Sequence, residues 1–174
     1  MEPLLHTQAL TKIFHQVVAI DSVSFDVRPG EIHCLLGENG AGKSTLAECI
    51  YGFYKPEQGE IFVEGQPVQM SSPAEAIGRG IGMVHQHFVL VPTLSVLENI
   101  VVGTNASGIL LELGKAEKEV KRLCQRYCVE LDLGAKVWQL PVGQQQWVEI
   151  LKVLYVGARL LILDEPTAVL TPQE

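Results

Sequence analysis

Residues 37–45 read Gly37-Glu38-Asn39-Gly40-Ala41-Gly42-Lys43-Ser44-Thr45, which matches the pattern G-x-x-x-x-G-K-[ST]. Glycines at these spacings allow backbone conformations that a Cβ would block, so successive N–H groups can point at phosphate oxygens. Lys43 would reach the terminal phosphates of a nucleotide, and the Ser44 hydroxyl would bind Mg²⁺. The stretch therefore predicts a phosphate-binding loop. The residues expected to bind nucleotide there are Gly37, Asn39, Gly40, Ala41, Gly42, Lys43, Ser44 and Thr45.

The residues on either side of this loop fit that prediction. Ile32 to Leu36 is apolar and predicts a strand that runs straight into Gly37. The apolar positions of residues 46–50 suit a short helix that Gly52 closes, and its N-terminus would favour negative charge. Because the loop lies between a predicted strand and a predicted helix, a phosphate-binding loop is a better interpretation than a Gly-rich turn without function.

A second segment predicts another part of the same site. Leu160-Leu161-Ile162-Leu163 is a continuous apolar run, as expected for a central parallel strand covered on both faces, and it ends at Asp164 and Glu165. Asp164 would hold Mg²⁺, often through water, and Glu165 would polarise the water that attacks the γ-phosphorus. An exposed acidic turn is the alternative, which the phosphate-binding loop disfavours because Mg²⁺ needs such a carboxylate.

The remaining patterns predict short strands and two amphipathic helices. Strands are expected at Leu4 to Leu10, Val23 to Val27 and Ile61 to Val63. Two helices are expected within Lys115 to Cys128 and Gln144 to Tyr155, each with one apolar stripe that we interpret as a core face. Those stripes consist of Val120, Leu123, Cys124, Tyr127 and Cys128 in the first helix and of Trp147, Val148, Leu151, Leu154 and Tyr155 in the second.

Composition narrows the classes of function. The 174 residues are 47% hydrophobic and 19% charged, which suits one domain with a real core. The formal net charge of −7 argues against non-specific binding to nucleic acid or to anionic membranes. The N-terminus predicts no secretory signal, and the longest apolar runs are too short to span a bilayer, so any membrane role would be that of a peripheral subunit.

The four cysteines form no CxxC pair and have no neighbouring His at a metal-ligand spacing. We expect buried free thiols in a reducing compartment. Cys124 and Cys128 lie four residues apart on a predicted helix, so a two-thiolate site is conceivable, although it lacks further ligands.

Four motifs in the sequence resemble those of one family. Leu140-Pro141-Val142-Gly143-Gln144-Gln145-Gln146, followed by the strand that ends at Asp164 and Glu165, is similar to the signature segment and the Walker B strand of the ABC ATPases. Gln86 resembles the Q-loop glutamine, and Phe14 resembles the aromatic A-loop residue. The resemblance covers essentially the whole chain. It implies an α/β P-loop NTPase fold with a mostly parallel core sheet, an N-terminal antiparallel β subdomain and a helical subdomain, incomplete at the C-terminus.

The resemblance also implies roles for these residues. Phe14 would stack on adenine, with an ordinary core position as the alternative. Gln86 would give an oxygen to Mg²⁺ or to the attacking water, with a solvated loop residue as the alternative. Val142, Gly143 and Gln144 would face the γ-phosphate bound by a partner domain. The family therefore implies ATP and Mg²⁺ as cofactors, with Glu165, Lys43 and Gln86 as catalytic residues and with Ser44, Gln86 and Asp164 as metal ligands.

Two residues depart from the family pattern. Pro141 stands where the signature segment usually has Ser, and it offers neither a hydroxyl nor a backbone N–H. Trp147 stands where Arg is usual. We expect the composite site that this signature completes to be weakened.

Residues 91–100 and 167–174 look most like the simple-sugar and nucleoside importer branch, in which two ATPase halves are usually fused. The chain would then be a first half: residues 1–89 and 157–174 would form the catalytic core with its β subdomain, and about 90–156 the helical subdomain. Thr171-Pro172-Gln173-Glu174 has the form of a capping box for a helix that does not follow. The expected switch histidine is also absent, so we expect little turnover from this chain alone.

The implied function is ATP-driven energy coupling for an importer of a small solute such as a sugar or nucleoside. The implied partners are a second ABC ATPase domain and transmembrane permeases, at the cytoplasmic face of the plasma (inner) membrane. Two alternatives stay open: a degenerate half that binds ATP in a regulatory role, which Pro141 and Trp147 favour, and a non-transport ABC ATPase. A GTPase is disfavoured because no N-K-x-D motif follows the phosphate-binding loop.

Overall fold

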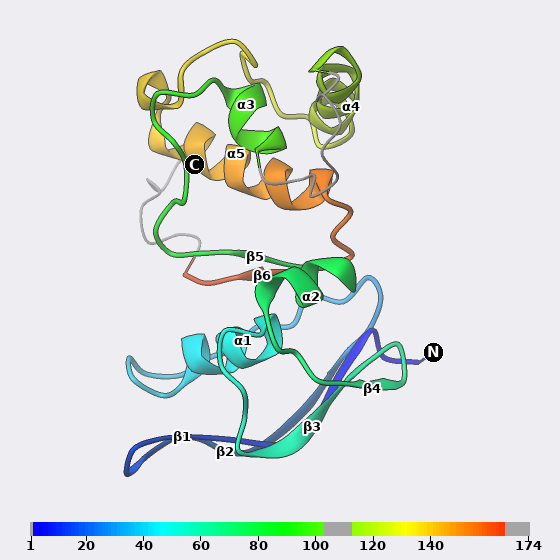
Figure 1. The fold of residues 1–174 in the computed structure, drawn as a ribbon, viewed down its shortest axis with the longest axis vertical. Coiled ribbons are helices and arrows are strands. Elements are labelled where there is room, and N and C mark those ends of the chain that lie inside the picture. Colours follow the sequence, from blue (N-terminus) through cyan, green and yellow to red (C-terminus); the bar gives the residue numbers. More distant parts are fainter. Residues whose placement is uncertain (1, 103–112, 166–174) are drawn as a thin grey trace. The chain divides into compact units, whose positions relative to one another are not determined.

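The computed structural model describes residues 2–102 and 113–165. The chain divides into two compact units, Met1–Ile81 and Gly82–Glu174, and each is described by itself (Figure 1). The segment 167–174, which suggested the importer branch and a capping box, lies outside the described residues. The boundaries predicted for the catalytic core and the helical subdomain stay a prediction.

The first unit contains a four-stranded antiparallel sheet. Its strands are β1 (Leu5–Phe14), β2 (Val17–Val27), β3 (Gln58–Val63) and β4 (Gln66–Val68), and they lie in the order β2-β1-β3-β4. Leu5 of β1 pairs with Val27 on one side and with Val63 on the other. The three strands that the sequence predicts in this region are therefore confirmed, and the pairing joins them into the expected antiparallel N-terminal sheet.

Two helices complete this unit. Helix α1 (Lys43–Tyr51) buries an apolar face that consists of Leu46, Ala47, Cys49, Ile50 and Tyr51. Gly52 ends the helix in the left-handed conformation with φ 85°, as the sequence predicts. Helix α2 (Pro73–Gly78) begins after Ser72, whose side chain accepts a hydrogen bond from the backbone N–H of Glu75.

The strand expected at Ile32 to Leu36 is absent from the described structure. This stretch runs without regular secondary structure, and Ile32 and Leu36 are 96% and 89% exposed. A strand exists only where a neighbour pairs with its N–H and C=O groups. Within residues 2–102 and 113–165 no strand pairs with this stretch, so apolar sequence alone does not make it one.

The second unit begins with a two-stranded sheet of β5 (Ile81–Val84) and β6 (Leu160–Leu163). All of β5 is buried, and the backbone N–H of Asp164 donates to the Val84 carbonyl at 3.1 Å. Strand β6 is confirmed at the predicted residues, but the expectation that it is covered on both faces is wrong for them. Leu163 is 43% exposed, because β5 is the one strand beside β6 in the described part of the chain.

Helices form the rest of the second unit. They are α3 (Val96–Val101), α4 (Leu113–Arg126), the 3₁₀ turn η1 (Val137–Gln139) and α5 (Val142–Tyr155). Their shared core consists of Val96, Ile100, Val120, Leu123, Leu133, Val148 and Leu151. Helix α3 starts with a capping box, in which the Ser95 and Glu98 side chains each accept from the other's backbone N–H.

The predicted apolar stripes of α4 and α5 are confirmed at their centres and wrong at their edges. Val120 and Val148 are fully buried, whereas Tyr127 is 39% and Trp147 37% exposed. Tyr127 lies one residue beyond the end of α4, where helical periodicity no longer decides its direction. Trp147 immediately precedes Val148 and so points about 100° away from it around the helix axis.

The prediction of free thiols is confirmed for the four cysteines, but the prediction that they are buried is wrong for two of them. All four thiols are free, but Cys34 and Cys128 are exposed, and Cys49 alone among them is fully buried. Burial on α1 raises the pKa of the Cys49 thiol to about 11. Within the described residues, no helix combines the length and the apolar character that crossing a bilayer requires.

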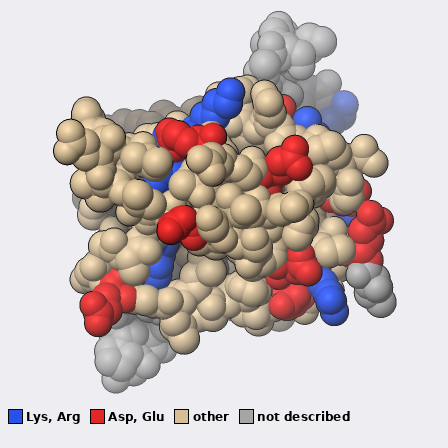
Figure 2. Space-filling view, turned by 90° about the horizontal axis from the view of Figure 1, so that it is seen from below, with Lys and Arg blue, Asp and Glu red and all other residues tan. Residues whose placement is uncertain are grey.

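The surface carries mixed charges. On the face shown in Figure 2, acidic side chains are scattered among uncharged ones, and the basic side chains form no continuous patch among the residues described there. This distribution agrees with the acidic balance of the sequence.

Gly82 provides a test of how α5 packs on β5. A Cβ at Gly82 would overlap Cγ1 of Val153 and lie 3.1 Å from the Cβ of Ala158. We expect Gly82→Ala to lower the free energy of unfolding by about 1–3 kcal/mol, because Val153 is a stiff, buried neighbour. Urea unfolding would measure it. Gly78→Ala, at the end of α2 with open space around its Cβ, is the control, and an equal loss in both variants would contradict the packing argument.

Candidate functional site

The loop of residues 37–42 curves around the ammonium group of Lys43. Lys43 Nζ donates to the carbonyls of Gly37 at 2.8 Å and Glu38 at 2.9 Å, and the backbone N–H of Ala41 donates to the Glu38 carbonyl at 3.1 Å. Gly40 has φ 83° and Gly42 has φ 89°, a region in which side-chain-bearing residues are strained. The loop thus has the backbone conformations that the sequence motif predicts for binding phosphate.

Gly42 fixes this loop against the sheet. A Cβ at Gly42 would overlap the backbone oxygen of Ala19 in β2 and would lie 3.5 Å from Cγ2 of Ile20. A side chain at Gly37 would approach the Cβ of Ala41 to 3.2 Å. Only glycine therefore allows the first turn of α1 to lie directly on the main chain of β2.

The first turn of α1 suits an anion. The helix begins at Lys43 with Gly42 as its N-cap, has no side-chain cap and carries no acidic residue in its first turn. The N–H groups at a helix start have no partner within the helix, and together with the helix dipole they favour negative charge. The residues present therefore fit a phosphate group, and the oxygen donors of Ser44, Asp164 and Gln86 are of the type that Mg²⁺ prefers.

Phe14 lies half-buried at the end of β1, where it pairs with Val17 of β2. Val17 lies two residues before Ala19, so Phe14 is about 7 Å along the strand from the point where Gly42 contacts β2. The Tyr54 ring stands perpendicular to the Phe14 ring, with centroids 4.9 Å apart and an interplanar angle of 80°. The first unit therefore brings the predicted adenine-stacking residue near the predicted phosphate-binding loop.

Lys12 holds this aromatic pair, and sequence reasoning missed it. Its ammonium lies 5.1 Å from the Phe14 centroid and donates to the Lys55 carbonyl and the Glu57 carboxylate, each at 2.8 Å. The Lys12 ammonium, followed by the Ile13 N–H, lowers the pKa of the Glu57 carboxyl. Residues two apart on a strand share a face, so the spacing of Lys12 and Phe14 could have indicated that the two side chains lie together.

The second unit brings together Gln86 and Glu165, which are 79 residues apart in sequence. Gln86 Nε2 donates to Glu165 Oε2 at 3.0 Å. Glu165 has φ 47°, a left-handed conformation that is costly for a residue with a Cβ and that often marks functional sites. The placement of Asp164 and Glu165 beside Lys43 stays a prediction, because those residues belong to different units.

The predicted signature residues Val142, Gly143 and Gln144 form the first turn of α5. Pro141 is the N-cap residue, with φ −56° and ψ 156°, and it makes no side-chain capping bond. The first turn contains no acidic residue, and Val142 is 42% exposed. Like the start of α1, this helix N-terminus presents N–H groups without a capping side chain.

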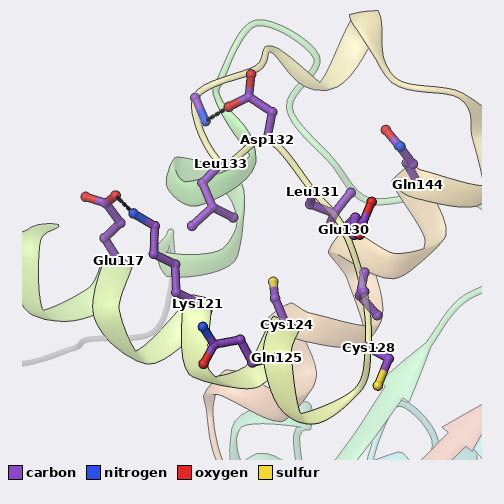
Figure 3. Close-up of a pocket in the computed structure, with 12 residues that line it drawn as sticks. Glu117, Lys121, Cys124, Gln125, Cys128, Glu130, Leu131, Asp132, Leu133 and Gln144 are labelled. Carbon is purple, nitrogen blue, oxygen red and sulfur yellow. Dashed lines mark hydrogen bonds and ion pairs between the residues drawn. The ribbon is translucent and has the colours of Figure 1, made fainter.

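A hollow of about 890 Å³ lies elsewhere in the second unit, between α4, the segment 128–134 and Gln144. Figure 3 shows Lys121 paired with Glu117 at one side of it, and the sulfurs of Cys124 and Cys128 pointing in different directions. Its lining contains three carboxylates, from Glu117, Glu130 and Asp132, against one lysine. Such a lining repels a polyphosphate, so this hollow does not compete with the loop of the first unit as a nucleotide site.

Comparison with known proteins identifies the family. Residues 20–168 match the family described as ABC transporter. The chain belongs to the ABC transporter family. The matched range includes the phosphate-binding loop, Gln86, the start of α5 and both acids that follow β6.

Curated relatives match along the whole chain. It is 47% identical to the glucose import ATP-binding protein TsgD13 of Haloferax volcanii, with 99% of this chain and 37% of that protein covered. It is 49% identical to the nucleoside import ATP-binding protein NupA of Lactococcus lactis and to the guanosine import ATP-binding protein NupO of Bacillus subtilis. Those two matches cover 99% and 100% of this chain and 34% of each relative. The chain thus spans about a third of the length of these curated relatives.

Solved structures confirm the predicted fold class. An ATP-binding cassette of an ABC transporter in its ADP conformation has a TM-score of 0.88 at 30% identity, with 99% of this chain and 72% of that chain covered. A dimeric bacterial ABC transporter cassette has a TM-score of 0.80 at 26% identity, with coverages of 97% and 77%. The α/β P-loop fold of the ABC ATPase type is therefore established for this chain.

Gly42 and Gly40 offer a matched test of the loop geometry. Both have positive φ, but a Cβ at Gly42 would overlap the Ala19 backbone, whereas a Cβ at Gly40 would meet nothing within 4 Å. We expect Gly42→Ala to displace the loop and to lower the melting temperature by several degrees more than Gly40→Ala. Thermal unfolding of both variants measures this. Equal melting temperatures would mean that contact with β2 does not fix the loop.

Proposed function

We propose that this chain binds ATP with Mg²⁺ and hydrolyses the γ-phosphate bond to drive an importer for a small solute, a sugar or a nucleoside. The observation that carries the proposal is the loop of residues 37–44, which curves around the Lys43 ammonium and leads into an uncapped helix N-terminus without acidic residues. The solutes for which the relatives are named, glucose, nucleosides and guanosine, support the solute class.

Each residue has a physical task in this proposal. The Lys43 ammonium exchanges the carbonyls of Gly37 and Glu38 for the β- and γ-phosphate oxygens, which are stronger acceptors because they are charged. Phe14 offers its ring to adenine, in an orientation that Tyr54 and Lys12 maintain. Mg²⁺, when bound by Ser44, Asp164 and Gln86, would neutralise charge on the phosphates.

Glu165 is the proposed general base. Its carboxylate would accept a proton from the water that attacks the γ-phosphorus. Gln86 would orient this carboxylate through the 3.0 Å hydrogen bond from its Nε2. That bond joins a proposed Mg²⁺ ligand, Gln86, to the residue proposed to activate water. The two tasks therefore depend on one contact.

The proposed partners are a second ABC ATPase domain and membrane permeases, with the chain at the cytoplasmic face of the membrane. The dimeric bacterial cassette among the similar structures supports a paired arrangement. In that arrangement the N-terminus of α5, with Val142, Gly143 and Gln144, would face the partner's nucleotide.

A second candidate is a degenerate half that binds ATP in a regulatory role with little hydrolysis of its own, and whose signature segment is weakened. Pro141 favours it, because the N-cap of α5 lacks the hydroxyl and the backbone N–H that serine would present to a phosphate. Trp147 adds an exposed apolar surface where a charge is usual in the family.

Substitution of Lys43 and Glu165 separates binding from hydrolysis. In the full-length protein we expect Lys43→Ala to weaken MgATP binding by at least about tenfold, because a charge-assisted contact to phosphate is lost. Glu165→Gln should retain binding and lower kcat by about 10²–10⁴-fold. Calorimetry and phosphate release measure the two effects. Lys121→Ala on α4 is the control, and normal turnover in Glu165→Gln would refute its role as the base.

Substitution of Pro141 tests the second candidate. We expect Pro141→Ser to strengthen ATP-dependent pairing and turnover at the partner's site by about tenfold, as a hydrogen bond to a charged acceptor allows. Serine also favours the N-cap position, so α5 should remain folded. ATP-induced association measured by sedimentation is the readout. Association and turnover equal to those of the parent protein would remove Pro141 as the cause of any weakness.

A further inference from the structure

The segment that follows Gln86 is held by its main chain. The backbone N–H of Val89 donates to Glu149 Oε1 at 2.6 Å, and Lys152 Nζ donates to the Val89 carbonyl at 3.3 Å. Both polar groups of one residue are thus bound by two side chains of α5. Val89 is 63% exposed, so its side chain contributes little to this attachment.

Glu149 is unusual for its position. It is 6% exposed and lies among the buried residues of α5 beside Val148 and before Leu151. Removing a carboxylate from water is costly unless hydrogen bonds and an opposite charge compensate. The Val89 N–H supplies the hydrogen bond, and Lys152 supplies the charge at 4.0 Å. An apolar residue would serve the helix core at lower cost, so helix stability alone does not account for Glu149.

Asn99 holds the same segment two residues further on. Its Oδ1 accepts from the Val91 N–H at 2.8 Å, and its Nδ2 donates to the carbonyls of Val91 at 3.1 Å and Ser95 at 3.0 Å. Asn99 is 2% exposed. The chain from Gln86 to α3 is therefore attached by its backbone to α5 first and to α3 next.

These contacts form a continuous path within the second unit. Val153 of α5 packs where Gly82 of β5 has no side chain, Glu149 holds Val89, and Gln86 donates to Glu165. We propose that Glu149 and Lys152 are positioning residues that set the place of Gln86 relative to Glu165. This inference rests on the proposed function for its catalytic consequence.

The path connects the N-terminal turns of α5, which carry the predicted signature residues, to Gln86 and Glu165 of the same chain. Glu149 lies seven residues after Val142, about two helical turns from the N-terminus of α5. Glu149 and Lys152 hold the Val89 main chain, and Gln86 lies three residues before Val89. Release of Val89 would therefore change the distance from Gln86 to the Glu165 carboxylate.

Hydrogen exchange tests the attachment without nucleotide. In the full-length protein, we expect Glu149→Ala to raise the exchange rate of the Val89 amide at least about tenfold, because its acceptor is gone. Glu149→Gln retains an acceptor oxygen and should restore most of the protection. Glu119→Ala is the matched control, since Glu119 makes an i,i+3 pair with Arg122 on exposed positions of α4. Exchange in Glu149→Ala at the parent rate would overturn the proposal.

Kinetics test the consequence for the site. Glu149→Ala should lower kcat for ATP by about 10–100-fold through misplacement of Gln86, while ATP affinity, which depends on the loop of the first unit, stays unchanged. Glu149→Gln should recover most of the rate, and Lys152→Met should show a smaller loss of the same kind. Loss of affinity together with rate in every variant would indicate general unfolding and overturn the positioning role.

The exchange and kinetic experiments distinguish a failure of the positioning role from a failure of the proposed function on which it rests. Parent protein that does not hydrolyse MgATP would contradict the proposed function, and amide exchange at Val89 would then decide the attachment alone. Parent protein that hydrolyses ATP, beside a Glu149→Ala variant with an unchanged kcat, would leave the function standing and refute the positioning role.

Discussion

The close approach of Gly42 to the Ala19 backbone is the constraint on which the first unit depends. It places the start of α1 directly on β2, at the end of the hairpin that carries Phe14. With a side chain at position 42 the helix would have to move away from the strand. The Lys43 ammonium would then lose its place inside the loop, and the distance from the loop to the Phe14 ring would change. A contact that only glycine permits thus relates the two predicted parts of a nucleotide site.

Helix α5 has the corresponding place in the second unit. Its buried face supplies Val148 and Leu151 to the helical core, its later turns pack on β5 through Val153, and its first turn carries the signature residues. Glu149 lies between these regions and binds a main-chain N–H instead of filling the core. One helix therefore contributes to the helical core, packs on β5 and binds the segment that follows Gln86.

Sequence reasoning succeeded where the chemistry is local and failed where it depends on a partner. The helix that follows the Gly-rich loop, its end at Gly52, and the strands of the first sheet follow from the spacing of apolar residues and from glycines within a few positions. Ile32 to Leu36 was wrongly expected to be a strand, since a strand requires a neighbour that apolar composition does not supply. Trp147 and Tyr127 were misplaced because helical periodicity is weakest at the edge of a stripe and past the helix end.

The residues that sequence reasoning missed share one property, which is that they bind main-chain atoms. Lys12 donates to the Lys55 carbonyl, Asn99 binds both polar groups of Val91, and Glu149 accepts from Val89. A main-chain partner leaves no mark in the sequence, because every residue except proline offers the same N–H and C=O groups. The signal lies instead on the other side of the contact, as a charged or amide side chain at a position where the helix or strand pattern requires an apolar one. Glu149 and Asn99 both fit that description, since each lies on the buried face of its helix. Polar residues at such positions therefore indicate where a loop is held, even when the loop's own side chains, such as that of Val89, face solvent.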